Sequence, residues 1–333
     1  MQNLLDPAIL FFVFGVVAGL LKSDLEVPAP IARFLSLYLL MALGLKGGFA
    51  LEQSGLGASV LVTLAAAILM AFLVPVLGYN VLKHHVSRLN AAAIAASYGS
   101  VSAVTFLTAM QHLEAAGMPA GGHMAVVMVI MESPAILMAV FLANRLRRTV
   151  GAVAAQPVPA NTGEPAAAPV GSLGAIVRES FTNGSHLLLL GALVIGFVSG
   201  EAGKAVMAPF SSDLFKGMLA FFLLDMGLLV ARNLGALRGR APVLLAYAVI
   251  APPVHASIAL ALAYTLGLPT PDAVLLMVLS ASASYIVVPA VLRHAIPEAS
   301  PSLYFGLSLG ITFPLNLLVG IPVYTAMARA VLG

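Results

Sequence analysis

The sequence predicts an all-α polytopic membrane protein, with ten transmembrane helices in two inverted five-helix repeats whose broken helices meet near the midplane. Three observations lead to this prediction. The chain is far more apolar than a soluble protein, its basic residues gather in alternate loops, and one serine-rich stretch occurs twice within apolar segments.

Composition excludes a water-soluble globular protein. Of the 333 residues, 61% are hydrophobic and 9% are charged, whereas about a quarter of the residues in a soluble domain are charged. The apolar residues form segments of about 20 residues, enough to cross a hydrocarbon core of about 30 Å, and not the short alternating strands of a membrane barrel. The chain has no cysteine, which excludes disulfides and thiol chemistry. We expect a lipid environment, with no metal centre, no cofactor and no nucleic-acid partner.

The apolar segments define ten expected spans with one long interruption. The spans are expected at residues 7–22, 30–51, 57–80, 90–111, 124–146, 184–201, 208–231, 241–267, 272–293 and 303–329. Between the fifth and sixth lies "GAVAAQPVPANTGEPAAAPVGS", whose Ala, Pro and Gly are typical of a flexible linker. This predicts a first repeat at 1–148, a cytoplasmic linker at 149–183 and a second, inverted repeat at 184–333. The first span has no basic region ahead of it, so we expect it to act as an uncleaved insertion signal.

Basic residues predict the orientation of the spans. One set of alternate loops carries Lys22, Arg33, Lys83, Arg88, Arg145, Arg147, Arg148, Arg178, Arg232, Arg238, Arg240 and Arg293. The opposite loops carry Lys204, Lys216 and Arg329. Because positive residues are retained in the cytoplasm, we expect both termini on the outer side.

The two halves of the chain resemble each other. Adding 182 to the positions of three residues in the first half gives matching residues in the second: Ser100 and Ser282, Ser102 and Ser284, His112 and His294. Further matches pair "FGVVAGLL" (14–21) with "GALVIGFV" (191–198), "LGLKGGFALEQ" (43–53) with "MGLLVARNLGA" (226–236), and Pro134 with Pro314. Each half has an odd number of spans, so the second half enters the membrane upside down, as in secondary transporters with inverted repeats.

Small hydroxyl residues inside a span indicate a binding site at a helix break. Free N–H groups and the positive dipole end of a half-helix favour an anion, and Gly and Ser let the backbone approach it. We expect the anion at Gly99, Ser100, Ser102, Thr105, Ser282, Ser284 and Tyr285, with Ser280 nearby. Tyr285 either donates its phenolic O–H there or narrows the pocket. Close helix packing also favours small residues, but the duplication at matching positions favours a site.

Ionisable residues inside spans are costly and usually functional. Glu132 lies two residues before Pro134, which removes a backbone hydrogen bond. Its carboxylate either carries a cation or a proton, or stays protonated and bonded to a neighbouring helix. Lys46 and Asp225 either form an internal ion pair, or Lys46 extends to the outer surface. For His255 we expect a neutral imidazole bonded to a carbonyl rather than a proton relay.

Several stretches resemble one known family. They are "YGSVSAVTFLTAMQHLE", "MESPAILMAVFLAN", "MGLLVARNLGALR", "YAVIAPPVHASIAL" and "PAVLRHAIPEASPSLYFGLSLGITFPLNLLVGIP", and they are similar to the SbtA family of sodium-dependent bicarbonate transporters. The resemblance covers nearly the whole chain. It implies a bacterial inner-membrane transporter, a core domain that moves against a gate domain, a homotrimer, and a small PII-like regulator on the cytoplasmic face.

The second serine stretch departs from the pattern of that family. Where these transporters carry Ser-Ser-Ser-Asp-Ile-Ser-Gly-Pro, this chain reads "SASYIVVP". Tyr285 stands at the acidic position and is followed by Val287 and Val288, so one carboxylate and one hydroxyl are missing. The resemblance places the coupling cation at Glu132, with the hydroxyls of Ser102 and Thr312. Sodium prefers several hard oxygen ligands, so the choice between a sodium ion and a proton as co-substrate stays open.

The sequence therefore predicts a secondary active transporter that imports a small anion, with bicarbonate by sodium symport as the leading expectation. A proton-coupled carrier of another small anion or carboxylate, and a non-transporting sensor with the same fold, stay open as alternatives. We expect no enzymatic activity, because the sequence offers no paired intramembrane carboxylates, metal-ligand spacing or phosphate-binding glycine loop. A channel would not require an inverted repeat with an ionisable group inside a span.

Overall fold

The computed structural model consists of helices and their connections wherever the chain is described. It describes residues 6–55, 57–132, 134, 135, 137, 138, 141, 184–237, 239, 241–285, 288, 292 and 296–333. The first-half elements are α1 (Pro7–Leu20), α2 (Ala29–Ser54), α3 (Ala58–Leu82), α4 (Arg88–Gly99) and α5 (Ala103–Ala115), followed by helical residues 124–132. The second-half elements are α8 (Gly184–Ala208), η2 (Pro209–Asp213), α9 (Leu214–Asn233), η3 (Leu234–Leu237), α10 (Pro242–Leu266), α11 (Thr270–Ala281), α13 (Pro301–Leu307), η4 (Ser308–Thr312), α14 (Phe313–Leu315), η5 (Asn316–Gly320) and α15 (Ile321–Leu332).

Some features predicted from the sequence lie outside the described residues. The expected linker at 149–183 is one, and Val287 and His294 are others. The same holds for the basic residues Arg145, Arg147, Arg148, Arg178, Arg238, Arg240 and Arg293.

Six helical stretches of the described chain are long and apolar enough to cross a membrane: 29–53, 59–82, 88–115, 187–233, 242–266 and 301–332. The stretch at 187–233 has 47 residues, and at 1.5 Å per residue it would be about 70 Å long if straight. That is more than twice the thickness of a hydrocarbon core. Gly200 interrupts it with φ 54° and ψ −147°, a conformation that glycine adopts readily. The chain is a multi-pass membrane protein.

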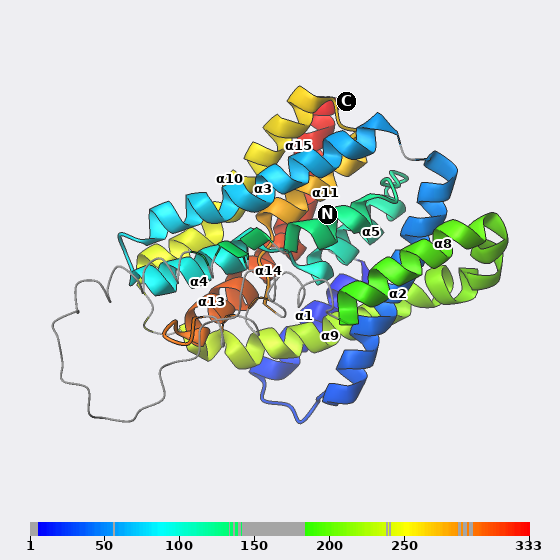
Figure 1. Ribbon diagram of the computed structural model, residues 1–333. Coiled ribbons are helices and arrows are strands. Elements are labelled where there is room, and N and C mark those ends of the chain that lie inside the picture. The colour runs from blue at the N-terminus through cyan, green and yellow to red at the C-terminus, as the bar shows by residue number, and fades with distance from the viewer. Residues whose placement is uncertain are drawn as a thin grey trace, which may run out of the picture.

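The helices form two groups, and each group takes helices from both halves of the chain (Figure 1). We call the first the paired-helix group, and it consists of α1, α2, α8 and α9. In this group α2 packs along α8, and α1 packs along α9. In the crossing group, α3 packs against α4 and α10 against α11, and α5 and α13–α15 complete it. The boundary between the predicted repeats is therefore a boundary in sequence and not one between two separately packed bodies.

Small residues let the helices of the paired-helix group approach closely. A Cβ on Gly227 of α9 would meet the Cα of Gly15 on α1, and a Cβ on Gly44 of α2 would meet the Cβ of Ala192 on α8. Such contacts between small residues are the usual basis of close helix packing in membranes. They leave no space for a larger side chain at either crossing.

The outer faces of the helices are apolar, as a lipid environment requires. Large apolar side chains are exposed along α1, α3, α8 and α10, among them Leu10, Phe14, Leu61, Leu69, Val194, Val198, Ile250 and Val254. An apolar face of this extent would be a liability in water. In a bilayer it contacts the hydrocarbon core.

Proline explains why the last helical stretch widens in two places. The segments η4 and η5 are π-helical. Pro314 lies two residues after the end of η4, and Pro322 lies two residues after the end of η5. Proline lacks the N–H that would bond the carbonyl four residues back, and that carbonyl lies inside the π-helical segment. π-helical turns are frequent at functional sites. The expected span at 303–329 is thus one helical stretch, but an irregular one.

Candidate functional site

The candidate site lies where two helix breaks meet. The expected span at 90–111 is divided into α4 and α5 by residues 100–102, and α11 is followed by the non-helical residues 282–285. Adding 182 to the bounds of α4, 88 and 99, gives the bounds of α11, 270 and 281. Both breaks begin with an extended serine: Ser100 has φ −95° and ψ 169°, and Ser282 has φ −81° and ψ 169°.

Hydrogen bonds join the two breaks directly. The N–H of Ser284 donates to the carbonyl of Ser97 at 2.7 Å, and the Ser97 Oγ donates to the carbonyl of Ser284 at 2.6 Å. The N–H of Ser102 donates to the Oγ of Ser282 at 3.0 Å. The two serine stretches that match in the sequence therefore lie against each other. We call this contact, formed by residues 97–102 and 280–285, the serine crossing.

Several of the predicted site hydroxyls stabilise the crossing itself. The Oγ of Ser102 accepts from the N–H of Thr105 at 3.2 Å and from its Oγ1 at 2.9 Å, which makes Ser102 the N-cap of α5. The Oγ of Ser284 accepts from the N–H of Val288 at 3.4 Å. The Oγ of Ser282 donates to the carbonyl of Leu279 at 2.8 Å. These bonds give the four hydroxyls a structural role, and their contact with substrate stays a prediction.

Two hydroxyls at the crossing have no such role. Ser100 and Ser280 are 0% and 2% exposed, and neither Oγ has a hydrogen-bond partner among the described residues. Leaving a buried polar group unsatisfied costs about 1–3 kcal/mol, and such groups are nearly always bonded in native proteins. A bound ligand or an ordered water would satisfy both hydroxyls.

Tyr285 connects the crossing to the paired-helix group through a row of rings. The Ser102 Oγ donates to the Tyr285 hydroxyl at 3.5 Å. The Tyr285 ring packs 5.1 Å from that of Phe313, and Phe313 meets Phe12 edge-on at 5.5 Å. Phe12 belongs to α1, so this aromatic row bridges the two helix groups. Tyr285 thus both bonds Ser102 and fills space beside it.

Close helix packing, rather than approach to an anion, explains why a glycine stands at position 99. A Cβ at this position would meet the ring of Pro75 on α3. A larger residue would push α3 away from the last turn of α4. The expected contact between Gly99 and the anion stays a prediction.

A second polar set surrounds the crossing and includes Thr312. The Thr312 Oγ1 donates to the carbonyl of Ala248 at 2.9 Å and is hydrogen-bonded to the Tyr98 hydroxyl at 2.7 Å. Asn316 donates through Nδ2 to the carbonyl of Ala281 at 2.7 Å, which satisfies one of the free carbonyls at the end of α11. The sequence analysis missed Asn316; an asparagine inside an apolar segment was the signal for it.

Glu132 is buried with 6% exposure in a helical stretch, and the helical residue Pro134 is buried too. Ser102 and Thr312, the other expected cation ligands, belong to two different hydrogen-bond sets. A cation site formed by these three residues stays a prediction.

A cavity of about 620 Å³ lies between the two helix groups. Residues of α1, α5, α9, η5 and α15 line it, and we call it the terminal vestibule because it extends from Asp6 to Arg329. Thr108 lines the vestibule, while Thr105, about one helical turn away, is bonded to Ser102. The vestibule therefore ends about one turn of α5 from the serine crossing.

A comparison with protein families covers almost the whole chain. The family model of the Na+-dependent bicarbonate transporter superfamily matches residues 7–329. The chain belongs to this superfamily. The match extends from α1 into α15, so it includes the serine crossing, the aromatic row and most of the vestibule, and it assigns a transporter role. The chain matches no curated protein sequence.

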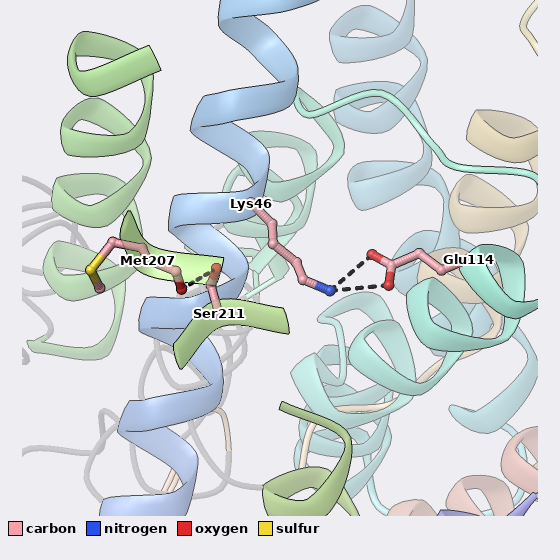
Figure 2. A network of polar contacts seen from close by, with 4 residues as sticks. All are labelled: Lys46, Glu114, Met207 and Ser211. Atoms are coloured by element: carbon pink, nitrogen blue, oxygen red, sulfur yellow. Dashed lines mark hydrogen bonds and ion pairs between the residues drawn. The ribbon is translucent and has the colours of Figure 1, made fainter. Parts of the chain in front are cut away.

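In this superfamily member Lys46 pairs with Glu114 (Figure 2), so an ion pair with Asp225, one of the two alternatives for Lys46, is wrong. The Lys46 Nζ lies 3.0 and 3.1 Å from the two Glu114 carboxylate oxygens. It also lies 4.6 Å above the ring centroid of Phe215 on α9. The alternative of a pair with Asp225 followed from the position of both residues inside expected spans, and such a position does not determine which helix faces meet.

His255 of this transporter also differs from expectation. His255 is buried with 3% exposure, but its Nδ1 has no hydrogen-bond partner in the described part of the chain. The expected bond to a carbonyl is therefore not found at this nitrogen.

A buried pair that the sequence analysis missed joins the start of α11 to the preceding half. The His123 Nε2 lies 3.5 Å from an Asp272 carboxylate oxygen, and the N–H of Gly121 donates to the other oxygen at 2.8 Å. Subtracting 182 from Asp272 gives Asn90, whose Oδ1 accepts from the N–H of Ser300, also at 2.8 Å. The repeat offset therefore relates two positions whose side chains each accept from a backbone N–H of the other half.

Proposed function

We propose that this superfamily member takes up a small anion, bicarbonate in the first place, together with sodium, by alternating access across the bacterial inner membrane. One observation carries the proposal. Two helix breaks are hydrogen-bonded to each other at the serine crossing and leave the hydroxyls of Ser100 and Ser280 buried without a partner among the described residues. A site between broken helices is the common arrangement of inverted-repeat transporters.

The proposal includes ten spans in two inverted repeats, with both termini outside, and matching contacts in the two halves support it. Residues 12–15 and Gly227 correspond to residues 189–192 and Gly44 by the sequence matches of the repeat. A Cβ on Gly227 would meet the carbonyl of Phe12, and a Cβ on Gly44 would meet the carbonyl of Leu189. The same helix crossing therefore occurs twice, with α1 against α9 and α8 against α2.

The chemistry of the crossing suits an oxyanion. The crossing residues 97–102 and 280–285 contain no basic side chain, so the attraction would come from helix ends. The N-terminal end of α5 begins there, and a helix N-terminus favours an anion by up to about 2 kcal/mol in partly buried geometry. The hydroxyls of Ser100 and Ser280 would donate to the anion's oxygens.

Sodium coupling is the part of the proposal that depends on Glu132. Because Tyr285 stands at the acidic position of the resembled family, the proposal assigns the balance of the cation's charge to Glu132. The oxygens of Ser102 and Thr312 would complete its coordination. A proton on Glu132 is the alternative, because a proton needs no further oxygen ligands.

For the transport step we propose that the crossing group is the core and the paired-helix group is the gate. The close contacts of α1 with α9 and of α2 with α8 would keep the gate rigid, so that the core moves against it. As further expectations, a homotrimer would assemble through the apolar outer faces, and a PII-like regulator would bind on the cytoplasmic side.

Uptake of labelled bicarbonate into proteoliposomes tests the proposal. An inward sodium gradient is compared with an inward proton gradient at matched ionic strength and with no gradient. We expect sodium-driven uptake that Ser100→Ala and Glu132→Ala lower, while Ser257→Ala, an exposed serine of α10, leaves it unchanged. Uptake driven by the proton gradient and not by the sodium gradient would mean that the coupling ion is a proton. No uptake under any gradient would favour a sensor and overturn the proposal.

A further inference from the structure

We propose that the terminal vestibule is a second anion-binding site, where Arg329 and Gln111 receive the anion before it reaches the serine crossing. This inference rests on the proposed function, because it concerns the same substrate. The vestibule has a volume of about 620 Å³, which lies within the usual range for ligand sites. Its lining includes the exposed residues Ala115, Ala326 and Arg329, so it opens to the surface.

Gln111 provides the first reason for a ligand. Its side chain lines the vestibule and is 7% exposed. Its Oε1 is buried and has no hydrogen-bond partner within the described ranges. A carboxamide presents both a donor and an acceptor, and bicarbonate carries both a charged oxygen and an O–H. Nitrate is also planar and singly charged but has no O–H, so a site at Gln111 should prefer bicarbonate to nitrate.

Arg329 provides the charge. It lies in the last turn of α15, is exposed, and its Nε donates to the Sδ of Met118 at 3.3 Å. It forms no ion pair with a carboxylate of the described residues, whereas Lys204, on the same expected outer side, is paired with Glu201 at 3.2 Å. A guanidinium is weakly hydrated and offers a planar fork of donors that matches an oxyanion.

Asp6 carries the opposite charge to Arg329, so removing each charge should change the Kd of the anion in opposite directions. It also lines the vestibule, and its Oδ1 accepts from the N–H of Ala8 at 2.8 Å as the N-cap of α1. Its negative charge weakens anion binding. Asn is an equally good N-cap, so Asp6→Asn removes the charge while keeping the cap.

The aromatic row reaches the serine crossing at Tyr285 and is not part of the lining of the vestibule. Leu317 lines the vestibule, and Phe313 lies about one turn earlier in the same helical stretch. Phe313 contacts both Phe12 and Tyr285. An anion at Arg329 is therefore outside the row, and the vestibule site is distinct from the crossing.

A single-cysteine reporter measures binding without transport. The chain has no cysteine, so Ala115→Cys, in the lining of the vestibule, can carry one environment-sensitive fluorophore. Thr265→Cys is the matched control, because it is exposed near the end of α10 and does not line the vestibule. The purified full-length protein in detergent is titrated with bicarbonate and with nitrate at constant ionic strength. We expect a saturable response at Ala115→Cys, tighter for bicarbonate, and none at Thr265→Cys.

Variants in the Ala115→Cys background test the named groups. Loss of one charge contact near the surface should change the apparent Kd roughly three- to tenfold. We expect Arg329→Ala to raise the Kd, Arg329→Lys to restore part of the loss, and Asp6→Asn to lower the Kd. Gln111→Leu should remove the preference for bicarbonate over nitrate, and Lys216→Ala, an exposed charge that does not line the vestibule, should change neither value.

The results separate this inference from the proposed function. Equal responses at the two reporters, or an unchanged Kd in Arg329→Ala and Asp6→Asn protein of normal thermal stability, would overturn the vestibule site even if uptake is sodium-driven. A specific response with no uptake by the parent protein would overturn the proposed function and leave the vestibule as an anion site. If Asp6→Asn raises the Kd instead, the Asp6 carboxylate contributes to binding, and the proposal that the vestibule holds an anion against this charge is wrong.

Discussion

Single residues of the serine crossing divide into those that hold the fold and those that are free to bind. Ser97 donates to the carbonyl of Ser284 at 2.6 Å in a buried site, so Ser97→Ala should lower the free energy of unfolding by about 1–3 kcal/mol. Ser100→Ala removes no bond to the described protein and takes away a buried hydroxyl without a partner there, so it should not lower stability, while uptake falls. Thermal unfolding in detergent and uptake, measured on the same preparations, test both expectations. A Ser100→Ala protein as unstable as Ser97→Ala would make Ser100 a structural residue.

Gly99 is a second residue whose role can be measured. A Cβ at Gly99 would meet the Pro75 ring, so Gly99→Ala should destabilise the protein by about 1–3 kcal/mol, the usual cost of overpacking. Gly191 lies in α8 with open space around it. Gly191→Ala should therefore be neutral or stabilise by about 0.5–1 kcal/mol. The comparison uses thermal melts, and equal effects of the two substitutions would contradict the packing explanation.

Sequence reasoning located the crossing but not its hydrogen bonds. The shift of 182 residues predicted equivalent helix breaks at the two serine stretches, and in the structure Ser100 and Ser282 each begin a break. It could not show that Ser282 bonds Leu279 while Ser100 has no partner among the described residues, because hydroxyl pairing depends on side-chain direction. The same limit explains Lys46, whose partner Glu114 follows it by 68 residues in the chain.

At the scale of elements, the repeat predicts that equivalent substitutions at the two equivalent helix crossings change the free energy of unfolding by similar amounts. Gly44 faces the carbonyl of Leu189 on α8, and Gly227 faces the carbonyl of Phe12 on α1. Gly44→Val and Gly227→Val should each destabilise the protein by at least about 1–3 kcal/mol and by similar amounts, because each forces two backbones apart. Gly217→Val, on the same helix as Gly227 but with open space, is the control. Thermal unfolding that shows one large and one negligible effect would argue against equivalent crossings.

Hydropathy predicted the α-helices better than the π-helical segments, because it reports hydrophobicity and not hydrogen-bond geometry. Hydropathy predicted helices at 30–51, 57–80 and 241–267, and α2, α3 and α10 lie there. It does not register the π-helical segments η4 and η5, because a change from α to π geometry alters hydrogen bonding without altering hydrophobicity. The prolines at 314 and 322 were the local signal. Their effect on the carbonyls four residues back could have been deduced from the chain alone.

At the scale of the whole molecule, the proposed alternating access requires the two helix groups to move against each other. Lys46 on α2 and Glu114 on α5 belong to different groups and form an ion pair at 3.0 Å (Figure 2). Their side chains are 18% and 34% exposed, so the pair contributes only about 0.2–1 kcal/mol. Such a contact can break in each transport cycle without a large barrier.

A cross-link across this pair tests the movement directly. In the cysteine-free chain, Lys46→Cys combined with Glu114→Cys is treated with a short bismaleimide. We expect the cross-linked protein to lose most of its bicarbonate uptake, because the link holds two bodies that must separate. Each single-cysteine variant treated with the same reagent, and the untreated double variant, should retain uptake.

A second cross-link within one group is the matched control. Gln53 on α2 is hydrogen-bonded to Glu201 on α8, and both helices belong to the paired-helix group. Linking Gln53→Cys to Glu201→Cys should leave uptake intact, because a rigid gate does not change its internal distances. Loss of uptake in both linked proteins would mean that the paired-helix group deforms during transport. Retention of uptake in both would mean that α2 and α5 stay together and that the site opens by another movement.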